Sequence, residues 1–232
     1  AGNDNISGGA GNDTFSFAAT GQLNADDTID GGEGTDNLDL TTNVDLDSSS
    51  TASTSVTLTG IEGVDITLGA DNLSFDAAGW TSLETLTFGS AANACTPTVN
   101  NIRDGVLATF SNLNIDDATL DTVAGASITV DAESAISNLT ITDAVNVTIN
   151  GEGATADLTS LTLDATDTKT LTLTADDGTS LDTGSITGTD EVTTITATTT
   201  KASGTITTGS SSATTGTIAD LDGLTTLNLS AT

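Results

Sequence analysis

The sequence predicts an all-β protein in which a parallel β-roll continues into a Thr-rich parallel β-solenoid. Three observations predict this fold. Glycine-rich nonapeptides stand near the N-terminus, segments that alternate apolar with polar residues recur along the rest of the chain, and aromatic residues make up only 3% of the 232 positions. The apolar residues are mainly Leu, Ile, Val and Ala. Together with the frequent Thr, the branched members favour strands over helices, because branching at Cβ fits a pleated surface.

The N-terminal forty residues contain an internal repeat. Residues 8–16 (GGAGNDTFS) and 31–39 (GGEGTDNLD) fit the pattern G-G-x-G-x-D-x-U-x, where U is a large apolar residue, and residues 2–7 (GNDNIS) match the end of a third copy. Glycines allow positive φ angles and close backbone approach, which leaves carbonyl oxygens facing a cation between stacked turns. The apolar residue points inward from a short strand, so each nonapeptide forms half a coil of a parallel β-roll.

The spacing of the two full copies predicts how they stack. We expect a strand at 14–17, a loop at 18–25 and a returning strand at 26–30, which places Asp13 and Asp36 opposite each other across a calcium ion. The complete set of expected metal-binding positions is Asp4, Gly8, Ala10, Asp13, Asp27, Asp30, Gly32, Gly34 and Asp36.

The charge balance also points to bound cations. The chain has 33 Asp and Glu residues against the three basic residues Arg103, Lys169 and Lys201, and its formal net charge is -30. Self-repulsion of this size destabilises a compact state unless counter-ions neutralise it, and it repels nucleic acid and anionic membranes. Calcium prefers several oxygen ligands, so we expect multiple calcium ions. No stretch is apolar enough for a transmembrane helix, so membrane insertion is not expected.

Beyond residue 41 the nonapeptide gives way to a second pattern. Segments such as 56–58 (VTL) and 171–173 (LTL) alternate apolar residues with Thr, and this period of two indicates half-buried strands. Residues 158–166 (LTSLTLDAT) and 224–232 (LTTLNLSAT) are close copies. The repetition favours a β-solenoid for this part, while a β-sandwich is the alternative that strands at this spacing also fit.

We therefore divide the chain into a calcium-binding β-roll at residues 1–40 and a Thr- and Asp-rich, solenoid-like repeat region at 41–232. A further division near 95–115 is an option. The sequence opens inside a repeat and without Met, so we expect it to be an internal or processed piece of a longer chain.

Three stretches depart from the alternating pattern. Residues 75–83, around Trp80, and 100–114 are expected to hold short helical turns or corners, and Trp80 is expected to cap one end of the core. Residues 189–216 are rich in Thr and Ser and poor in apolar anchors. We expect that stretch to be mobile or to be ordered by a neighbouring subunit.

Catalytic signatures are missing from this sequence. It contains no His, which removes Ser-His-Asp and Cys-His arrangements, and it has no phosphate-binding G-x-x-x-x-G-K-[ST] loop. Aspartate pairs at 26–27, 116–117 and 176–177 are the remaining candidates for glycosidase chemistry. Adjacent aspartates in turns are more commonly solvated or bound to calcium, so we expect no enzyme activity. The single cysteine, Cys95, forms no intrachain disulfide.

The motifs at 2–7, 8–16 and 31–39 resemble the calcium-binding nonapeptides of RTX proteins, a repeat class exported by type I secretion in Gram-negative bacteria. Residues 60–64 (GIEGV) are similar to parts of those β-rolls. The Thr-rich remainder resembles RTX-bearing surface-layer proteins in composition and pattern. The resemblance implies a secreted, extracellular protein that folds when it meets calcium outside the cell and assembles with copies of itself into a lattice on the cell surface.

Other functions share these features. An RTX adhesin or matrix protein would carry a separate ligand-binding domain, and the accessory domain of a secreted hydrolase or toxin would accompany a catalytic domain. T-x-T units such as Thr170-Leu171-Thr172 suggest an ice-binding ladder, which requires a flat Thr array, and the irregular coil lengths argue against it. The leading expectation is a structural, self-assembling surface protein, with a cell-surface polysaccharide as a candidate attachment partner.

Overall fold

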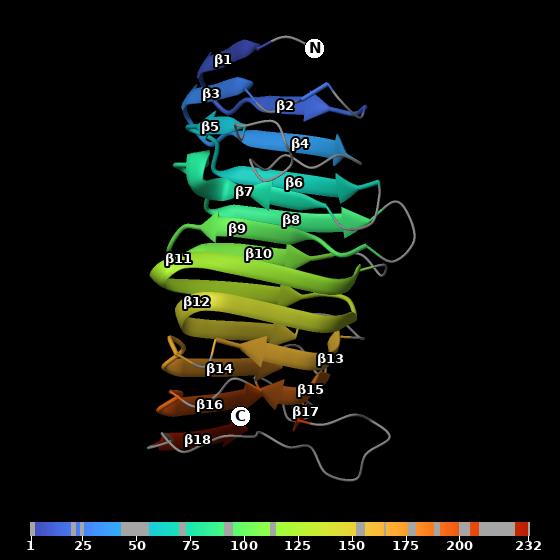
Figure 1. Cartoon of the computed structure of the whole chain (residues 1–232), viewed down its shortest axis with the longest axis vertical. Helices are drawn as coiled ribbons and strands as arrows, with labels where there is room; N and C mark the ends of the chain where they lie inside the picture. Colours follow the sequence, from blue (N-terminus) through green and yellow to red (C-terminus); the bar gives the residue numbers. More distant parts are fainter. Residues whose placement is uncertain are drawn as a thin grey trace.

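The computed structural model describes residues 3–19, 22–23, 26–42, 56–69, 73–90, 95–111, 115–151, 156–164, 166–175, 180–187, 191–199, 205–208 and 226–231. Within these ranges the chain forms a stack of parallel strands that wind back and forth between two facing sheet surfaces (Figure 1). The predicted all-β solenoid is therefore confirmed. In this part of the chain, no helix has the length and apolar character needed to cross a membrane.

Each coil contributes one strand to each face. The first face contains β1 (Asn5–Ala10), β3 (Thr28–Glu33), β5 (Thr57–Thr59), β7 (Ser74–Asp76), β9 (Thr98–Ile102), the first arms of β11 (Ile115–Ala132) and β12 (Ile136–Gly151), β13 (Ala156–Leu163), β15 (Ser180–Thr187) and β17 (Thr205–Thr208). The second face contains β2 (Thr14–Phe17), β4 (Asn37–Thr42), β6 (Gly63–Leu68), β8 (Thr85–Ser90), β10 (Val106–Phe110), the second arms of β11 and β12, β14 (Thr170–Ala175), β16 (Thr194–Thr199) and β18 (Thr226–Ala231).

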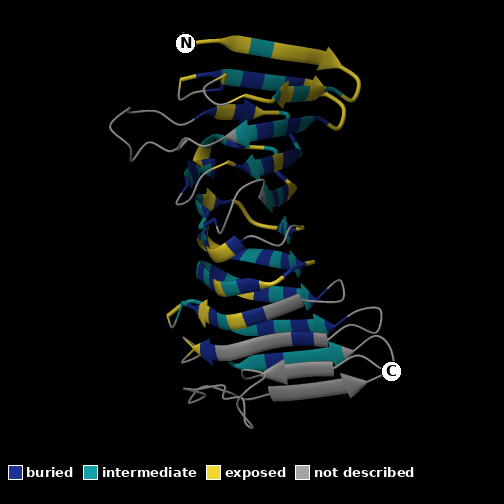
Figure 2. Ribbon diagram, turned by 90° about the vertical axis from the view of Figure 1, so that its right-hand side faces the viewer, coloured by how far each residue is buried: buried dark blue, intermediate teal, exposed yellow. Residues whose placement is uncertain are grey.

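Neighbouring coils stack with their residues in register. On the second face Phe15 pairs with Leu38, Leu38 with Val64, and Val64 with Leu86, so apolar side chains form a continuous inward ladder. Polar residues between them point outward, and Figure 2 shows the resulting alternation of buried and more exposed positions along the strands. The period of two in the sequence thus corresponds to the two sides of each strand.

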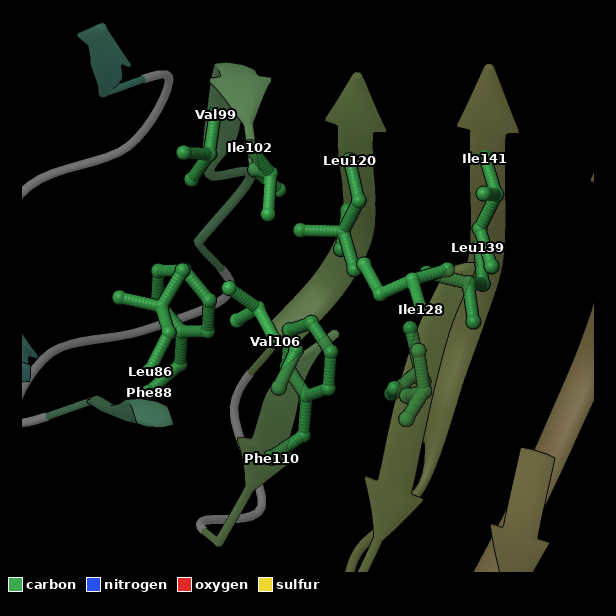
Figure 3. Close-up of a cluster of buried hydrophobic side chains, with 14 of the residues drawn as sticks. Leu86, Phe88, Val99, Ile102, Val106, Phe110, Leu120, Ile128, Leu139 and Ile141 are labelled. Carbon is green, nitrogen blue, oxygen red and sulfur yellow. The ribbon is translucent and has the colours of Figure 1, made fainter. Parts of the chain in front are cut away.

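The core fills the narrow space between the two faces. Figure 3 shows Val99 and Leu120 of the first face pointing toward Phe88, Phe110 and Ile128 of the second, and each of these side chains is at most 1% exposed. The rings of Phe88 and Phe110 come from adjacent coils and stack with centroids 5.1 Å apart. Few aromatic residues are needed because branched aliphatic side chains already span the gap between two close sheets.

The stretch around Trp80 contains the short helical turn that was predicted. The 3₁₀ helix η1 (Ala77–Gly79) is capped by Asp76, whose carboxylate accepts a hydrogen bond from the Ala78 amide. The prediction that Trp80 caps one end of the core is wrong. Trp80 forms a strand bridge with Leu58, donates its indole N–H to the Val56 carbonyl at 3.2 Å, and has core residues in the coils on both sides.

Corners between the faces take different forms along the stack. The corner expected within 100–114 is confirmed as the turn between β9 and β10, where Gly105 has a φ of 82°. The strands β11 and β12 instead pass through both faces, bending at 123–125 and at Asp143 respectively. The stretch 189–216 lies only partly within the described residues, where β16 and β17 continue the parallel ladders.

Candidate metal-binding turns of the β-roll

The two complete nonapeptides fold into stacked turns at one edge of the roll. Gly9 pairs with Gly32 across the coils, and both have positive φ angles, 104° and 102°. The next glycines of each repeat, Gly11 and Gly34, are also at positive φ, 113° and 145°. Residues with a Cβ rarely adopt this conformation, so the repeat glycines are required by the backbone of the turn.

Asp13 and Asp36 follow these turns and lie one above the other. The amide of Asp13 donates to Oδ1 of Asp36 at 2.7 Å, and the amide of Asn37 donates to the carbonyl of Asp13 at 2.9 Å. Asp36 is only 1% exposed. The spacing of the repeats predicts this juxtaposition, whereas metal ligation by the two carboxylates stays a prediction.

One oxygen of each aspartate has no partner among the described residues. Oδ2 of Asp13 and Oδ2 of Asp36 are both buried and accept no hydrogen bond there. Leaving a buried carboxylate oxygen unpaired is costly, because the group has lost its water without gaining another interaction. A bound cation would remove that cost, so the chemistry of these oxygens fits a metal site.

Carbonyl oxygens approach the same two carboxylates. A Cβ placed on Gly8 would contact Asp13 Oδ2 and would lie 2.7 Å from the Gly31 carbonyl oxygen. A Cβ on Gly31 would contact Asp36 Oδ2 and the Gly60 carbonyl oxygen. Each unpaired carboxylate oxygen therefore shares a small space with a carbonyl from the next coil, and such a set of hard oxygen donors suits calcium.

The other expected positions divide between two edges of the roll. Asp27 precedes β3 and lies at the edge opposite Asp36, where its Oδ1 accepts from the amide of Asp4 at 2.8 Å. Asp27 is 2% exposed. Asp30 lies within β3 near Gly60, and Ala10 is exposed at the end of β1. The structure thus brings Asp4 and Asp27 together, away from Asp13 and Asp36.

Glu62 is a candidate donor that the sequence did not identify. Its Oε2 accepts a hydrogen bond from the amide of Asp36 at 2.8 Å, and its own amide donates to the Asp36 carbonyl at 3.1 Å. Glu62 therefore relates to Asp36 as Asp36 relates to Asp13. The similarity of residues 60–64 to the repeats was the available signal, but it carried no information about a glutamate in place of aspartate.

A separate acidic cluster lies further along the stack, at the edge that also contains Asp13 and Asp36. Asp143, Asp164 and Asp167 come from two successive coils, and their carboxylate oxygens lie within 4.8 Å of one another. Burial, followed by the charges of Asp121 and the other two cluster members, raises the pKa of Asp143. Hydrogen bonds from Thr166 lower the pKa of Asp164.

The aspartate pair at 116–117 does not belong to the cluster of Asp143, Asp164 and Asp167. Asp117 is exposed and accepts a hydrogen bond from the Asn138 amide group, and Asp116 is also exposed. Residues 176–177 lie outside the described residues. Asp143 meets Asp164 and Asp167 through contact between two coils, and aspartates that are neighbours in the sequence do not indicate such contacts.

Comparison with protein-family models matches the RTX calcium-binding nonapeptide repeat (4 copies) to residues 1–19 and 24–43. The matched segments include Asp4, Asp13, Asp27 and Asp36 and end before Gly60. No curated protein and no solved structure matches the chain significantly. The turn geometry, the unpaired carboxylate oxygens and this match agree that residues 1–19 and 24–43 carry RTX calcium-binding nonapeptide repeats.

Proposed function

We propose that this protein is a secreted structural protein, without catalytic activity, in which calcium drives folding and then assembly on a cell surface. The carrying observation is that Asp13 and Asp36 each keep a buried carboxylate oxygen without a partner among the described residues. Where calcium is scarce, these carboxylates repel each other and the coils open. Where calcium is plentiful, outside the cell, a calcium ion bridges the two carboxylates and the coils close.

The proposed ligands are oxygen atoms of the two stacked edges. At the edge that follows β1 and β3, we propose as ligands the carboxylates of Asp13, Asp30 and Asp36 and backbone oxygens of Gly8, Ala10, Gly32 and Gly34, together with the Gly31 carbonyl that lies beside Asp13 Oδ2. At the opposite edge it uses Asp4 and Asp27. Residues 1–40 would then be the calcium-responsive part, and residues 41–232 the solenoid that it helps to order.

Assembly of a chain with a net charge of -30 is favoured at a surface without carboxylates. The second face offers one across β12, β14 and β16, where the outward positions are Asn146, Thr148 and Asn150, then Thr170, Thr172 and Thr174, then Thr194, Thr196 and Thr198. We call these nine residues the Thr face.

Two copies can bring their Thr faces together without juxtaposing like charges. Each Thr offers a methyl group for apolar contact and a hydroxyl that both donates and accepts hydrogen bonds. The rows repeat about every 4.8 Å from coil to coil, which lets many equivalent contacts form at once. We therefore propose a second copy of the chain as the occupant of the Thr face.

The test is a calcium titration of chelated protein, followed by circular dichroism and negative-stain imaging. We expect less β-structure and a lower melting temperature without calcium, and full β-structure with ordered sheets or filaments at millimolar calcium. Folding without assembly would shift the role to an adhesin, a matrix protein or an accessory domain. A chain indifferent to calcium would overturn the proposal.

A pair of variants tests the Thr face directly. Thr172→Asp places a charge at the centre of the face and is expected to abolish ordered assemblies while leaving the circular dichroism in calcium unchanged. Thr140→Asp adds the same charge on the first face, where Thr140 pairs with Thr119 and Thr162, and is expected to leave assembly intact. Equal behaviour of the two variants would exclude the Thr face as the contact.

A second candidate function, binding to ice, is favoured by the register of the same residues. Coil lengths vary, but the T-x-T strands β14 and β16 pair Thr170 with Thr194 and Thr172 with Thr196 without any shift. The Thr side chains therefore form a two-dimensional array, with about 4.8 Å between coils and about 6.7 Å along a strand. Thermal hysteresis of the calcium-bound protein measures this activity, and an unaltered ice-growth rate would reject it.

A further inference from the structure

We propose that residues 60–62 complete a second calcium site, between the second and third coils, and that Glu62 is its acidic ligand from the third coil. This inference rests on the proposed calcium role of Asp36. Residues 60–62 lie outside the matched repeats, and Gly60-Ile61-Glu62 lacks the nonapeptide pattern. The site is therefore built by one true repeat turn and one turn of a different kind.

The contacts around Asp36 reproduce those around Asp13, one coil further along. Oδ2 of Asp13 shares the space beside Gly8 with the carbonyl oxygen of Gly31, and Oδ2 of Asp36 shares the space beside Gly31 with the carbonyl oxygen of Gly60. Both carboxylate oxygens are buried and have no partner among the described residues. Two equivalent spaces between coils therefore each present an unsatisfied anionic oxygen and a carbonyl.

The Oδ2 atom of the buried Asp36 side chain lies in the space beside Gly31, between the second and third coils. Oδ1 already accepts the hydrogen bond from the Asp13 amide, and at 1% exposure the side chain has almost no access to water. Oδ2 is left beside the carbonyl of Gly60, in the gap that faces the third coil. A cation in that gap is the partner that satisfies this oxygen, because a lone buried charge would be strongly unfavourable.

Glu62 brings the second carboxylate to this gap. In the first pair of turns Asp36 follows Gly31 by a full repeat turn, whereas in the third coil only Ile61 separates Gly60 from Glu62. The longer glutamate side chain compensates for the shorter turn, and its Oε2 reaches the Asp36 amide at 2.8 Å. The other carboxylate oxygen is then the one assigned to the ion.

The two sites differ in their supply of backbone oxygens. Between the first two coils, the carbonyls of Gly9 and Gly11 lie against Gly32 and Gly34. The short turn at residues 60–62 has no residues that correspond to the later part of the repeat. Fewer protein ligands lower calcium affinity, so the second site is the weaker of the two.

The ladder of acidic ligands ends at Glu62. In the next coil Glu84 occupies the corresponding position, since its amide donates to the Glu62 carbonyl at 2.8 Å and Thr85 pairs with Gly63. Glu84 is exposed, and Trp80 and Leu83 fill its coil where a glycine turn would be needed. Glu84 is thus a matched control for Glu62.

Calorimetric titration of the full chain with calcium, from chelated protein, tests the inference. Glu62→Gln keeps an oxygen that can accept from the Asp36 amide but removes the charge. It is expected to weaken the lower-affinity class of sites at least tenfold and leave the tighter class unchanged, while Glu84→Gln changes neither. Unaltered calcium number and affinity in Glu62→Gln would overturn the inference. A wild-type chain that binds no calcium would instead overturn the proposed function.

A second measurement covers the case in which Glu62→Gln folds poorly. Terbium, excited through Trp80, the single tryptophan, reports an ion near that side chain, and the bridge from Trp80 to Leu58 places it close to Gly60 in the stack. The wild-type and Glu84→Gln chains are expected to give sensitised emission that calcium displaces. Emission of equal strength and calcium sensitivity in Glu62→Gln would again contradict the assignment.

Discussion

At the residue scale, Asp36 shows how one short side chain takes two roles. Its Oδ1 holds the backbone of the preceding coil, and its Oδ2 is left for a cation. Aspartate suits this arrangement because its few rotatable bonds cost little entropy when the carboxylate is fixed in a turn. A glycine must lie beside it, since a Cβ on Gly31 would occupy the space next to the free oxygen.

We predict that Gly31→Ala destabilises the calcium-bound protein by roughly 1–3 kcal/mol, the usual range for overpacking. The added Cβ would collide with the Gly60 carbonyl and the Asp36 carboxylate. Thermal unfolding in saturating calcium measures the effect. Gly89→Ala is the control, because Gly89 lies in β8 with no atom within 4 Å of the added methyl. Equal melting temperatures for the two variants would show that the space beside Gly31 is not constrained.

A second residue-scale prediction concerns Asp143. Its pKa is raised in the folded chain, so the folded state holds this proton to higher pH than the unfolded state, and the associated stability is lost as the pH rises through the folded pKa. In chelator at neutral pH, Asp143→Asn is therefore expected to stabilise the protein by about 0.5 kcal/mol. Asn tolerates the positive φ of 61° at this position.

The pH dependence supplies the control for this variant. Below the ordinary Asp pKa of 3.8, Asp143 is protonated in both the folded and the unfolded states, so the wild type and Asp143→Asn should unfold at similar urea concentrations. Urea unfolding in chelator at both pH values provides the comparison. A variant that is less stable than the wild type at neutral pH would mean that the charge at Asp143 is favourable.

Sequence reasoning reached only part of the site, for a physical reason. Asp13 and Asp36 follow from a repeat of constant spacing, and the structure stacks them as expected. Glu62 was not identified because the chain between the second and third coils is longer and because a glutamate stands where the motif has aspartate. The extra methylene group of Glu62 lets its carboxylate still reach the Asp36 amide. The cluster around Asp143 depends on contact between coils of unequal length, which a single sequence does not encode locally.

At the element scale, alternation predicted the strands better than it predicted their corners. The expected strand at 14–17 is β2, and the expected return at 26–30 overlaps β3. The bends of β11 and β12 were not predicted, because each strand continues through its bend without a separate loop. In β12 a single left-handed residue, Asp143, turns the chain where the other corners use longer loops.

We predict that Phe110→Ala costs roughly 3–5 kcal/mol, because it removes a fully buried ring and leaves a cavity beside Phe88. Each coil contacts mainly its neighbours, so hydrogen exchange should accelerate most in β8, β10 and β11. Phe110→Leu should cost about 1 kcal/mol, since much of the volume is kept. Loss of protection spread evenly along the stack would show that the solenoid unfolds as one cooperative unit.

At the scale of the whole molecule, charge repulsion and site occupancy are separate contributions to stability. The net charge of -30 comes from acidic residues spread along the sequence, and monovalent salt screens exposed charges over a Debye length of about 10 Å at 0.1 M. Screening does not satisfy a buried oxygen such as Oδ2 of Asp36. Sodium chloride and calcium should therefore stabilise the chain by different routes.

We predict that sodium chloride in chelator raises the melting temperature of the wild type and of Asp36→Asn to a similar extent, because both chains carry the dispersed repulsion. Calcium added at high salt should then raise it further in the wild type, and much less in Asp36→Asn. Asp39→Asn removes the same charge from a β4 side chain that accepts from Asn37, and should respond like the wild type. An equal calcium response in Asp36→Asn would mean that calcium acts only as a general counter-ion, because a specific site needs the carboxylate that this variant lacks.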